Sequence, residues 1–117
     1  VQNHFFGGVF VDLSHEIQGR EIIIYFSGEL DHYHTRKVIN YTERMALLYP
    51  KYDMVLDMKQ LNFMDSSGIA VVIYALKGAR ANGRKLLLRH VPKFAYKIFN
   101  AAGLCKLVEI HPWKGEE

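Results

Sequence analysis

The chain has 117 residues, half of them hydrophobic, and a formal net charge of +3 at pH 7. This length suits a single domain built on one hydrophobic core. No apolar run is long enough to span a bilayer, and no basic-then-apolar leader directs secretion. The one cysteine, Cys105, excludes an internal disulfide, which suits a reducing compartment. These features predict a cytoplasmic protein that does not insert into membranes.

The basic residues and histidines give little support to nucleic-acid binding or catalysis. A basic cluster complements the dipole at the end of the central helix, and no DNA- or RNA-binding motif accompanies it. His32 and His34 would point in different directions on a helix, which argues against a metal site. The sequence has no nucleophile elbow, phosphate loop or dinucleotide fingerprint. We expect no enzymatic activity, metal, cofactor or direct contact with nucleic acid. The cluster comprises Lys77, Arg80, Arg84, Lys85 and Arg89.

The N-terminal part of the chain predicts two strands. Residues 1–8 continue no readable pattern and are interpreted as a leader or a cloning remnant, ahead of a domain at residues 9–117. Strands are expected at residues 9–16 and 21–27, with a turn at residues 18–20 between them. The second strand is apolar at almost every position after its first, which predicts a central strand covered on both faces.

Three helices follow, each with apolar residues at three- and four-residue steps. Asp31 is expected to cap the first helix and Pro50 to mark its end. The second helix starts at the turn of residues 65–68 and is closed by Asn82 and Gly83, and the third ends at Gly103. The expected buried positions are Val38, Tyr41, Thr42, Met45 and Leu48, then Ile69, Val72, Ile73, Leu76 and Ala79, then Phe94, Ala95, Ile98, Phe99 and Ala102.

Further strands are expected at residues 54–58, 85–90 and 106–110. The element order is then strand–strand–helix–strand–helix–strand–helix–strand. Because helices separate the later strands, these strands should lie parallel to one another. The sequence therefore predicts an α/β fold of one domain, with a mixed β-sheet covered by helices.

The turn at residues 65–68, Asp-Ser-Ser-Gly, has two interpretations. Asp and Ser are favoured at a helix N-cap, so a cap by itself explains the turn. However, a second hydroxyl follows the first, and Gly68 weakens the first helical turn by roughly 1 kcal/mol relative to Ala. A glycine there leaves room for another molecule to reach the serines, and a phosphate is tolerated at the positive end of a helix dipole. The turn is then a cap that also serves as a modification site.

Three segments resemble motifs of a known family. Residues 63–69 (FMDSSGI), preceded by a hydrophobic strand and Asp57, are similar to the phosphorylation loop of bacterial anti-sigma-factor antagonists. Residues 28–32 (GELDH) resemble the family's other signature, and residues 99–104 (FNAAGL) resemble its helix with a final Gly-Leu step. These proteins are STAS (sulphate transporter and anti-sigma antagonist) domains. The resemblance covers nearly the whole chain.

The resemblance implies a regulator of transcription that works by partner switching, in a stress response or in sporulation. It assigns the phosphoacceptor role to Ser66, the first serine after the aspartate, in preference to Ser67. The implied partners are an anti-sigma factor that is itself a serine kinase, bound by the unphosphorylated protein, and a metal-dependent serine phosphatase. The expected partner-binding residues are Glu29, Asp31, Asp65, Ser66, Ser67 and Gly68.

Carboxylates at the ends of strands support this assignment, because such ends converge on one edge of an open α/β sheet. For Asp57, ordinary capping and solvation suffice.

Two alternative functions stay open. One is a STAS subunit of another assembly, such as a stress-signalling scaffold or a lipid-transport complex, which native mass and neighbouring genes would distinguish. The other is a small-molecule-binding or enzymatic domain, which would need a well-formed pocket holding Glu29, Asp31 and Asp65.

Overall fold

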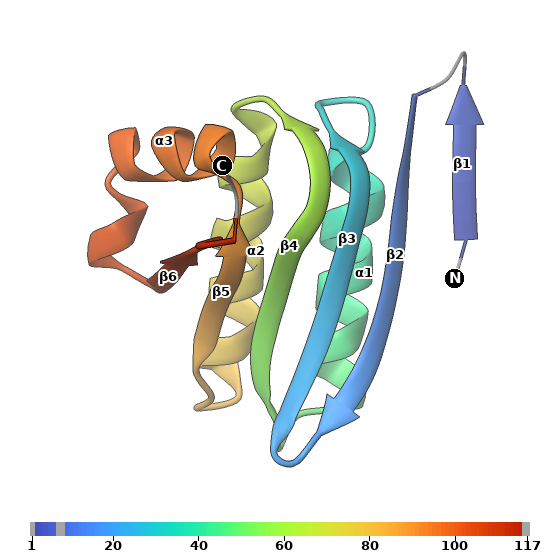
Figure 1. The fold of residues 1–117 in the computed structure, drawn as a ribbon. Helices are drawn as coiled ribbons and strands as arrows, with labels where there is room; N and C mark the ends of the chain where they lie inside the picture. The colour runs from blue at the N-terminus through green and yellow to red at the C-terminus, as the bar shows by residue number, and fades with distance from the viewer. Residues whose placement is uncertain (1, 7–8, 116–117) are drawn as a thin grey trace.

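The computed structural model describes the backbone of residues 2–6 and 9–115 and the side chains of residues 10–115. The predicted order of strands and helices is confirmed, with one additional strand at the N-terminal end (Figure 1). The elements are β1 (Gln2–Phe6), β2 (Val9–Gln18), β3 (Glu21–Leu30), α1 (Thr35–Leu48), β4 (Asp53–Met64), α2 (Ser67–Ala81), β5 (Leu86–Val91), α3 (Lys93–Ala101), the 3-10 helix η1 (Leu104–Lys106) and β6 (Glu109–Pro112).

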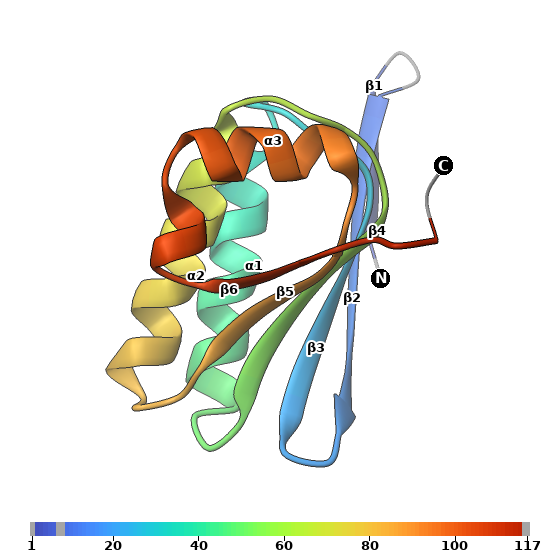
Figure 2. The same ribbon diagram turned by 60° about the vertical axis from the view of Figure 1, so that its left-hand side comes forward.

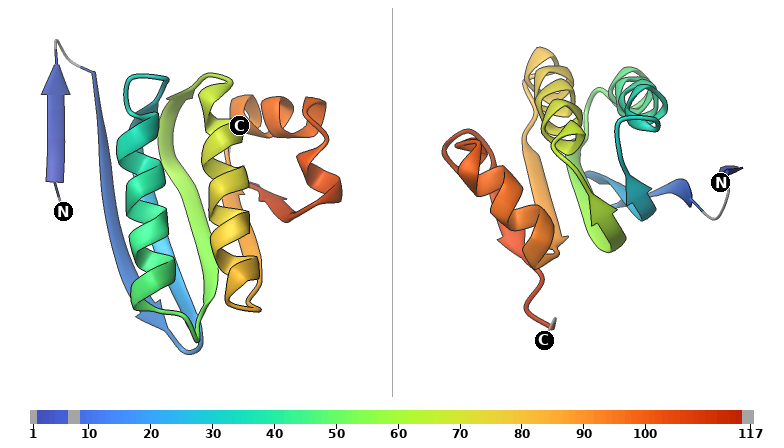
Figure 3. Two further views of the ribbon diagram at one scale, coloured as in Figure 1. Left: turned by 180° about the vertical axis from the view of Figure 1, so that it is seen from behind. Right: turned by 90° about the horizontal axis from the view of Figure 1, so that it is seen from above.

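The strands form one mixed sheet in the order β1-β2-β3-β4-β5-β6. The pairs β1/β2 and β2/β3 are antiparallel, whereas β3/β4, β4/β5 and β5/β6 are parallel, as the intervening helices predict. Helices α1 and α2 pack side by side on one face of the sheet (Figure 3). Helix α3 lies across the end of the sheet at which β5 ends (Figure 2). None of the described helices is long and apolar enough to cross a membrane.

The two faces of the sheet differ, because alternate residues of a strand point to opposite sides. Ile22, Ile24 and Phe26 of β3 point toward the helices and belong to the main core. The other face has no described helix over it, and in Figure 1 the sheet stands in front of α1 and α2. We call it the helix-free face. Ile23 and Val55 lie opposite each other in register and are buried on it. Tyr25 and Ser27 of β3 are only partly buried there, so the prediction that β3 is covered on both faces is confirmed only at Ile23.

The buried sides of the helices are only partly as predicted. Leu48, Ile73 and Ala102 are expected in the core but are exposed. Helix α1 packs on α2 as well as on the sheet, and this double contact defines a buried band that is shifted relative to the simple three- and four-residue pattern. The band includes Ile39 and Ala46 in α1 and Val71 and Ala75 in α2.

Strand β4 is longer than the predicted span of residues 54–58. Its second half, residues 59–64, pairs with the end of β3 through two irregularities in register. Four residues of this half are exposed, so this part of the sequence resembles a polar turn. They are Lys59, Gln60, Asn62 and Phe63. The extension carries the strand directly to the turn at residues 65–68.

Both ends of the sheet also differ from the prediction. Strand β1 pairs antiparallel with the first part of β2. The sequence predicts no strand at the residues of β1. The division into a leader at residues 1–8 and a domain at residues 9–117 stays a prediction, and residues 1, 7–8 and 116–117 lie outside the described part of the chain. The last strand begins at Glu109, because η1 ends at Lys106 and the chain turns at Leu107 and Val108 before the strand.

Candidate functional site

Two of the three motif segments lie side by side at one edge of the sheet. Because β3 and β4 are parallel, Glu29 pairs with Phe63 and Leu30 with Met64. The backbone N–H of Asp65 donates to the Leu30 carbonyl at 3.2 Å. The turns from β3 to α1 and from β4 to α2 therefore meet at the upper edge of the sheet in Figure 1.

Asp65, rather than a serine, supplies the side-chain cap of α2. Its Oδ1 accepts a hydrogen bond from the backbone N–H of Ser67 at 2.8 Å. Ser66 occupies the N-cap position in a helical backbone conformation, and its side chain makes no capping bond. Its backbone carbonyl accepts from Ile69 N–H at 3.1 Å. The Ser66 hydroxyl is left exposed and without a hydrogen-bond partner among the described residues.

Gly68 packs tightly against a buried side chain of the same protein. It is buried, and a Cβ at this position would overlap Met64 Sδ and lie 2.8 Å from Met64 Cγ. Met64 is itself buried at the end of β4. The glycine thus lets the first turn of α2 lie directly on the end of β4, which places the neighbouring Ser66 at the surface.

Asp31 organises the turn after β3. The prediction that it is the N-cap of α1 is wrong. Its Oδ1 lies 2.7 Å from His34 Nδ1 and accepts the N–H of Tyr33 at 3.0 Å. The helix starts later, and His34 takes the N-cap position because the carboxylate of Asp31 closes the preceding turn instead. The Asp31 side chain is only 15% exposed. Glu29 is partly exposed and has no hydrogen-bond or ion-pair partner among the described residues.

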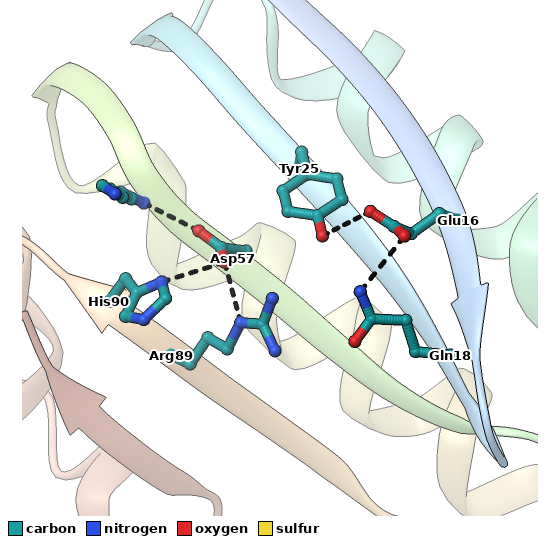
Figure 4. Close-up of polar contacts among 7 residues, drawn as sticks. Glu16, Gln18, Tyr25, Asp57, Arg89 and His90 are labelled. Carbon is teal, nitrogen blue, oxygen red and sulfur yellow. Dashed lines mark hydrogen bonds and ion pairs between the residues drawn. The ribbon is translucent and has the colours of Figure 1, made fainter.

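Asp57 is interpreted from the sequence as a capping or solvated residue, and this interpretation is wrong. It lies within β4 on the helix-free face, and its side chain is 6% exposed. Asp57 Oδ2 accepts from Arg89 Nε at 2.7 Å and lies 3.0 Å from His90 Nδ1, while Oδ1 accepts from Lys59 N–H at 3.1 Å (Figure 4). The contact between Asp57 and Arg89 follows from the strand register, because the two residues pair directly across β4 and β5.

Asp57, Arg89 and His90 form a cluster in which the carboxylate of Asp57 contacts both of the other side chains. Burial opposes the charge of Arg89, but the hydrogen bond to Asp57 and the attraction between the two groups outweigh burial and raise the pKa of Arg89. His90 has a φ of 55°, a left-handed conformation that is uncommon outside glycine. The Trp113 ring packs edge-on against His90, with ring centroids 4.8 Å apart. The cluster is a structural ion-pair network.

A second polar group lies on the same face (Figure 4). The Tyr25 hydroxyl donates to Glu16 Oε1 at 2.7 Å, and Gln18 Nε2 donates to Glu16 Oε2 at 3.1 Å. These bonds lower the pKa of Glu16, with that from Tyr25 contributing most, and the bond to Glu16 raises the pKa of Tyr25. Sequence analysis missed both groups. Polar residues at alternate positions of neighbouring strands are the signal that could have indicated them.

The edge and the helix-free face suit different chemistry. At the edge, an exposed hydroxyl lies at the N-terminus of a 15-residue helix, where the dipole favours an added anion. In the described part of the chain, no three His, Cys, Asp or Glu side chains gather as metal ligands would.

A fold of this topology with a serine turn after β4 defines a recognised class. Residues 12–116 match the model of the STAS domain family. The chain belongs to this family, which confirms the resemblance of the motifs.

Individual relatives carry more specific names. The chain is 31% identical over 111 residues to the anti-sigma-B factor antagonist of Listeria monocytogenes, a match that covers 91% of this chain and 95% of the relative. It is 31% identical over 91 residues to the anti-sigma F factor antagonist of Paenibacillus polymyxa, with 77% of each chain covered. Among solved structures, the unphosphorylated anti-sigma factor antagonist SpoIIAA has a TM-score of 0.72 at 22% identity, covering 85% of this chain and 87% of the other.

Proposed function

We propose that this protein is an anti-sigma-factor antagonist. It binds a serine-kinase anti-sigma factor while Ser66 is unphosphorylated and loses that partner when Ser66 carries a phosphate. The observation that carries the proposal is the Ser66 hydroxyl, which is exposed and has no hydrogen-bond partner among the described residues at the start of α2. The names of the two relatives, and the existence of SpoIIAA in a phosphorylated and an unphosphorylated form, support it.

The reaction needs only the hydroxyl from this chain. The kinase holds ATP, and Ser66 Oγ forms a new bond to the γ-phosphorus while the bond to the ADP oxygen breaks and the hydroxyl proton passes to a base of the kinase. A metal-dependent phosphatase reverses the change by hydrolysis, which returns serine and inorganic phosphate. The positive end of the α2 dipole lowers the cost of the added charge in the free protein.

Charge explains how the phosphate acts as a switch. Phosphoserine carries about −1.5 to −2 charges at neutral pH. It adds to the charges of Asp65, which precedes it, and of Glu29, whose strand ends beside β4. A charge that is desolvated at an interface without a partner costs several kcal/mol, and every 1.4 kcal/mol is about tenfold in affinity. Phosphorylation therefore dissociates the complex with little change of fold.

The proposed partner surface has two kinds of residue. Glu29, Ser66 and Ser67 are at least partly exposed and contact the partner directly. Asp31 and Asp65 hold the two turns through their hydrogen bonds. Gly68 contributes its small size, because it allows α2 to start close to the end of β4. The proposed partner surface thus consists of exposed residues that are carried by two hydrogen-bonded turns.

Serine variants test the switch with the purified kinase anti-sigma factor of the same organism. We expect Ser66→Ala to bind the kinase like the wild type but to gain no phosphate. Ser66→Asp should weaken binding at least about tenfold, because it introduces a permanent charge. Ser67→Ala is the matched control for the site of modification and should still gain its phosphate at Ser66. Calorimetry measures binding, and intact mass with site mapping measures the phosphate.

Two outcomes would contradict the proposal. If Ser66→Ala and Ser66→Asp both bind like the wild type and the phosphate maps elsewhere, the switch is not at Ser66. If the protein isolated from its own cells carries no phosphate during growth or stress, a constitutive subunit of a larger assembly is the better description.

A further inference from the structure

The end of the molecule opposite the serine turn is formed by three connections that contact one another. The β2–β3 turn, the α1–β4 connection and the α2–β5 connection lie at the lower end of the sheet in Figure 1. The backbone N–H of Asp53 donates to the Arg20 carbonyl at 2.9 Å, and Asp53 Oδ1 accepts from Arg84 Nε at 3.1 Å. We call this part of the molecule the loop end. It comprises residues 17–21, 47–53 and 81–85.

Large aliphatic side chains are exposed at the loop end. Leu47 is 81% exposed and the adjacent Leu48 is 60% exposed, and both belong to the last turn of α1. Tyr49 follows them, and its ring lies 5.9 Å from the ring of His15 in β2. Ile17 is two positions after His15, on the same face of β2, and is 40% exposed. The aliphatic side chains of both elements are thus displayed at one end of the molecule.

Unpaired cations accompany these apolar side chains. The side chains of Arg20, Lys51 and Lys85 are exposed and form no hydrogen bond or ion pair with the described residues. The loop end has four cations and two carboxylates in all. Of the carboxylates, Asp53 is neutralised by an ion pair and Glu21 is only partly exposed. The charge that the loop end presents is therefore positive.

The opposite end of the sheet has the reverse charge. Its two turns, residues 28–34 and 62–68, contain three carboxylates and no Lys or Arg. The molecule is therefore polarised along the direction of its strands. A negatively charged surface attracts the loop end and repels the end that carries Ser66.

We infer that the loop end binds the surface of an anionic lipid membrane. Leu47 and Leu48 enter the boundary between headgroups and acyl chains, and the cations contact lipid phosphates. Exposed leucines with flanking Lys and Arg are the combination by which proteins attach to the surface of such membranes. None of the described helices can cross a membrane, so the protein lies on the bilayer.

The size of the apolar patch favours a membrane over a protein partner. Ile17, Leu47 and Leu48 are three side chains, whereas a stable protein–protein interface takes about 20–30 residues on each side. Reversible attachment to a membrane needs less, because electrostatic attraction adds to a small apolar contribution. The inference does not depend on the proposed function, because none of these residues belongs to the proposed partner surface. Ser66 faces away from the membrane and stays accessible.

Co-sedimentation of the full chain with lipid vesicles tests the inference. Vesicles of phosphatidylcholine mixed with phosphatidylglycerol present an anionic surface, and vesicles of phosphatidylcholine alone present a neutral one. We expect binding to the anionic vesicles and much weaker binding to the neutral ones. Added salt should release the protein, because it screens the attraction between the cations and the lipids.

Variants of the loop end should separate the two contributions. Leu47→Ser and Leu48→Ser should each lower the affinity for anionic vesicles about tenfold, because each removes an apolar side chain from the membrane boundary. Lys51→Gln and Lys85→Gln should each lower it about fivefold and should reduce its dependence on salt. All four residues are exposed, and thermal melts will verify that the variants fold.

Tyr33→Ser and Lys97→Gln are the matched controls. Tyr33 is 80% exposed, close to the value for Leu47, but it lies in the turn after β3 at the opposite end. Lys97 is exposed on α3, which also lies across that end (Figure 2). Both variants should bind anionic vesicles like the wild type.

Several results would overturn the inference. They are a failure to sediment with anionic vesicles at low salt, an equal loss of binding in Tyr33→Ser, or unchanged binding in both leucine variants. Analytical ultracentrifugation without vesicles provides a further test. Self-association that Leu47→Ser abolishes would assign the leucines to a contact between copies of the chain, and would also overturn the inference.

Discussion

Strand β4 carries one aspartate in its middle and leads to another just beyond its end, and the two have opposite roles. Asp57 is buried on the helix-free face in an ion pair with Arg89. Asp65 lies at the edge of the sheet, where it caps α2 beside the exposed Ser66. The two residues are of the same type and belong to neighbouring stretches of chain. Their roles differ because Asp57 faces a charged residue in register, whereas Asp65 has the start of a helix after it.

The comparison shows how a strand that is paired on both sides supports an exposed turn at its end. The central part of β4 is held on both sides, by β3 and by the Asp57–Arg89 pair to β5. The turn after Met64 reaches the surface, and there the hydrogen bond to Asp65 leaves the serine hydroxyl free. Changes in the middle of β4 should therefore alter stability, and changes at its end should alter binding.

The largest effect is expected from Asp57→Asn. This change leaves the Arg89 charge partly buried without its counter-ion, and breaking a buried pair is strongly destabilising. Because the Arg89 side chain is 27% exposed, we expect a loss of about 2–4 kcal/mol in the free energy of unfolding, measured by urea denaturation at pH 7. Phosphorylation at Ser66 should persist under conditions in which the variant is folded.

The Asp53–Arg84 pair provides the control for that experiment. Its side chains are 30% and 39% exposed, so Asp53→Asn should cost about 1 kcal/mol. If Asp57→Asn unfolds at the same urea concentration as Asp53→Asn, the network on the helix-free face contributes no more than a surface pair.

A smaller loss is expected from Asp65→Ala. Removal of an N-cap acceptor costs about 1 kcal/mol, and Asp65→Asn should retain most of that stability because an amide oxygen also accepts the Ser67 N–H. Ser66→Ala should change stability by less than about 0.5 kcal/mol, since its hydroxyl makes no capping bond. Thermal or urea unfolding of the three variants checks this order. A larger loss for Ser66→Ala than for Asp65→Ala would reverse the assignment of the cap.

The smallest effect is expected from Tyr25→Phe. The hydrogen bond from Tyr25 is the main reason that the pKa of Glu16 lies below its ordinary value of 4.5. Because this pKa is lower in the folded chain, the associated stabilisation is present above pH 4.5 and is lost as the pH falls through the folded value. In Tyr25→Phe, the pKa of Glu16 should rise toward 4.5, as followed by NMR titration of its carboxyl carbon.

Tyr74→Phe serves as the control for the titration, since Tyr74 is an exposed tyrosine of α2 and makes no hydrogen bond with the described residues. An unchanged pKa of Glu16 in Tyr25→Phe would show that the Tyr25–Glu16 bond is absent in solution.

The order of the elements and the meeting of the two motifs could be predicted from local signals. Turns, helix stops such as Gly83 and Gly103, and the strand–helix alternation together define a mixed sheet whose strand ends share one edge. The placement of Ser66 at the start of a helix on that edge follows from the same signals.

The remaining features depend on contacts between distant residues. The role of Asp57 depends on its register with Arg89, 32 positions later, which no local pattern shows. Gly68 is interpreted from the sequence as space for a partner, but in the structure the space is filled by Met64. Leu48 and Ile73 are exposed because the packing of α1 on α2, and not helical spacing by itself, defines which side is buried.

The strand order has a consequence for how the chain folds. Each strand of the sheet pairs with the strand that follows it in the sequence, so no pairing has to wait for a segment from the opposite end of the chain. A newly synthesised chain can form the β2–β3 hairpin first and then add β4, β5 and β6 as each crossover helix emerges. Such a route keeps the loops that must close short, and it favours rapid folding without a long-lived open edge.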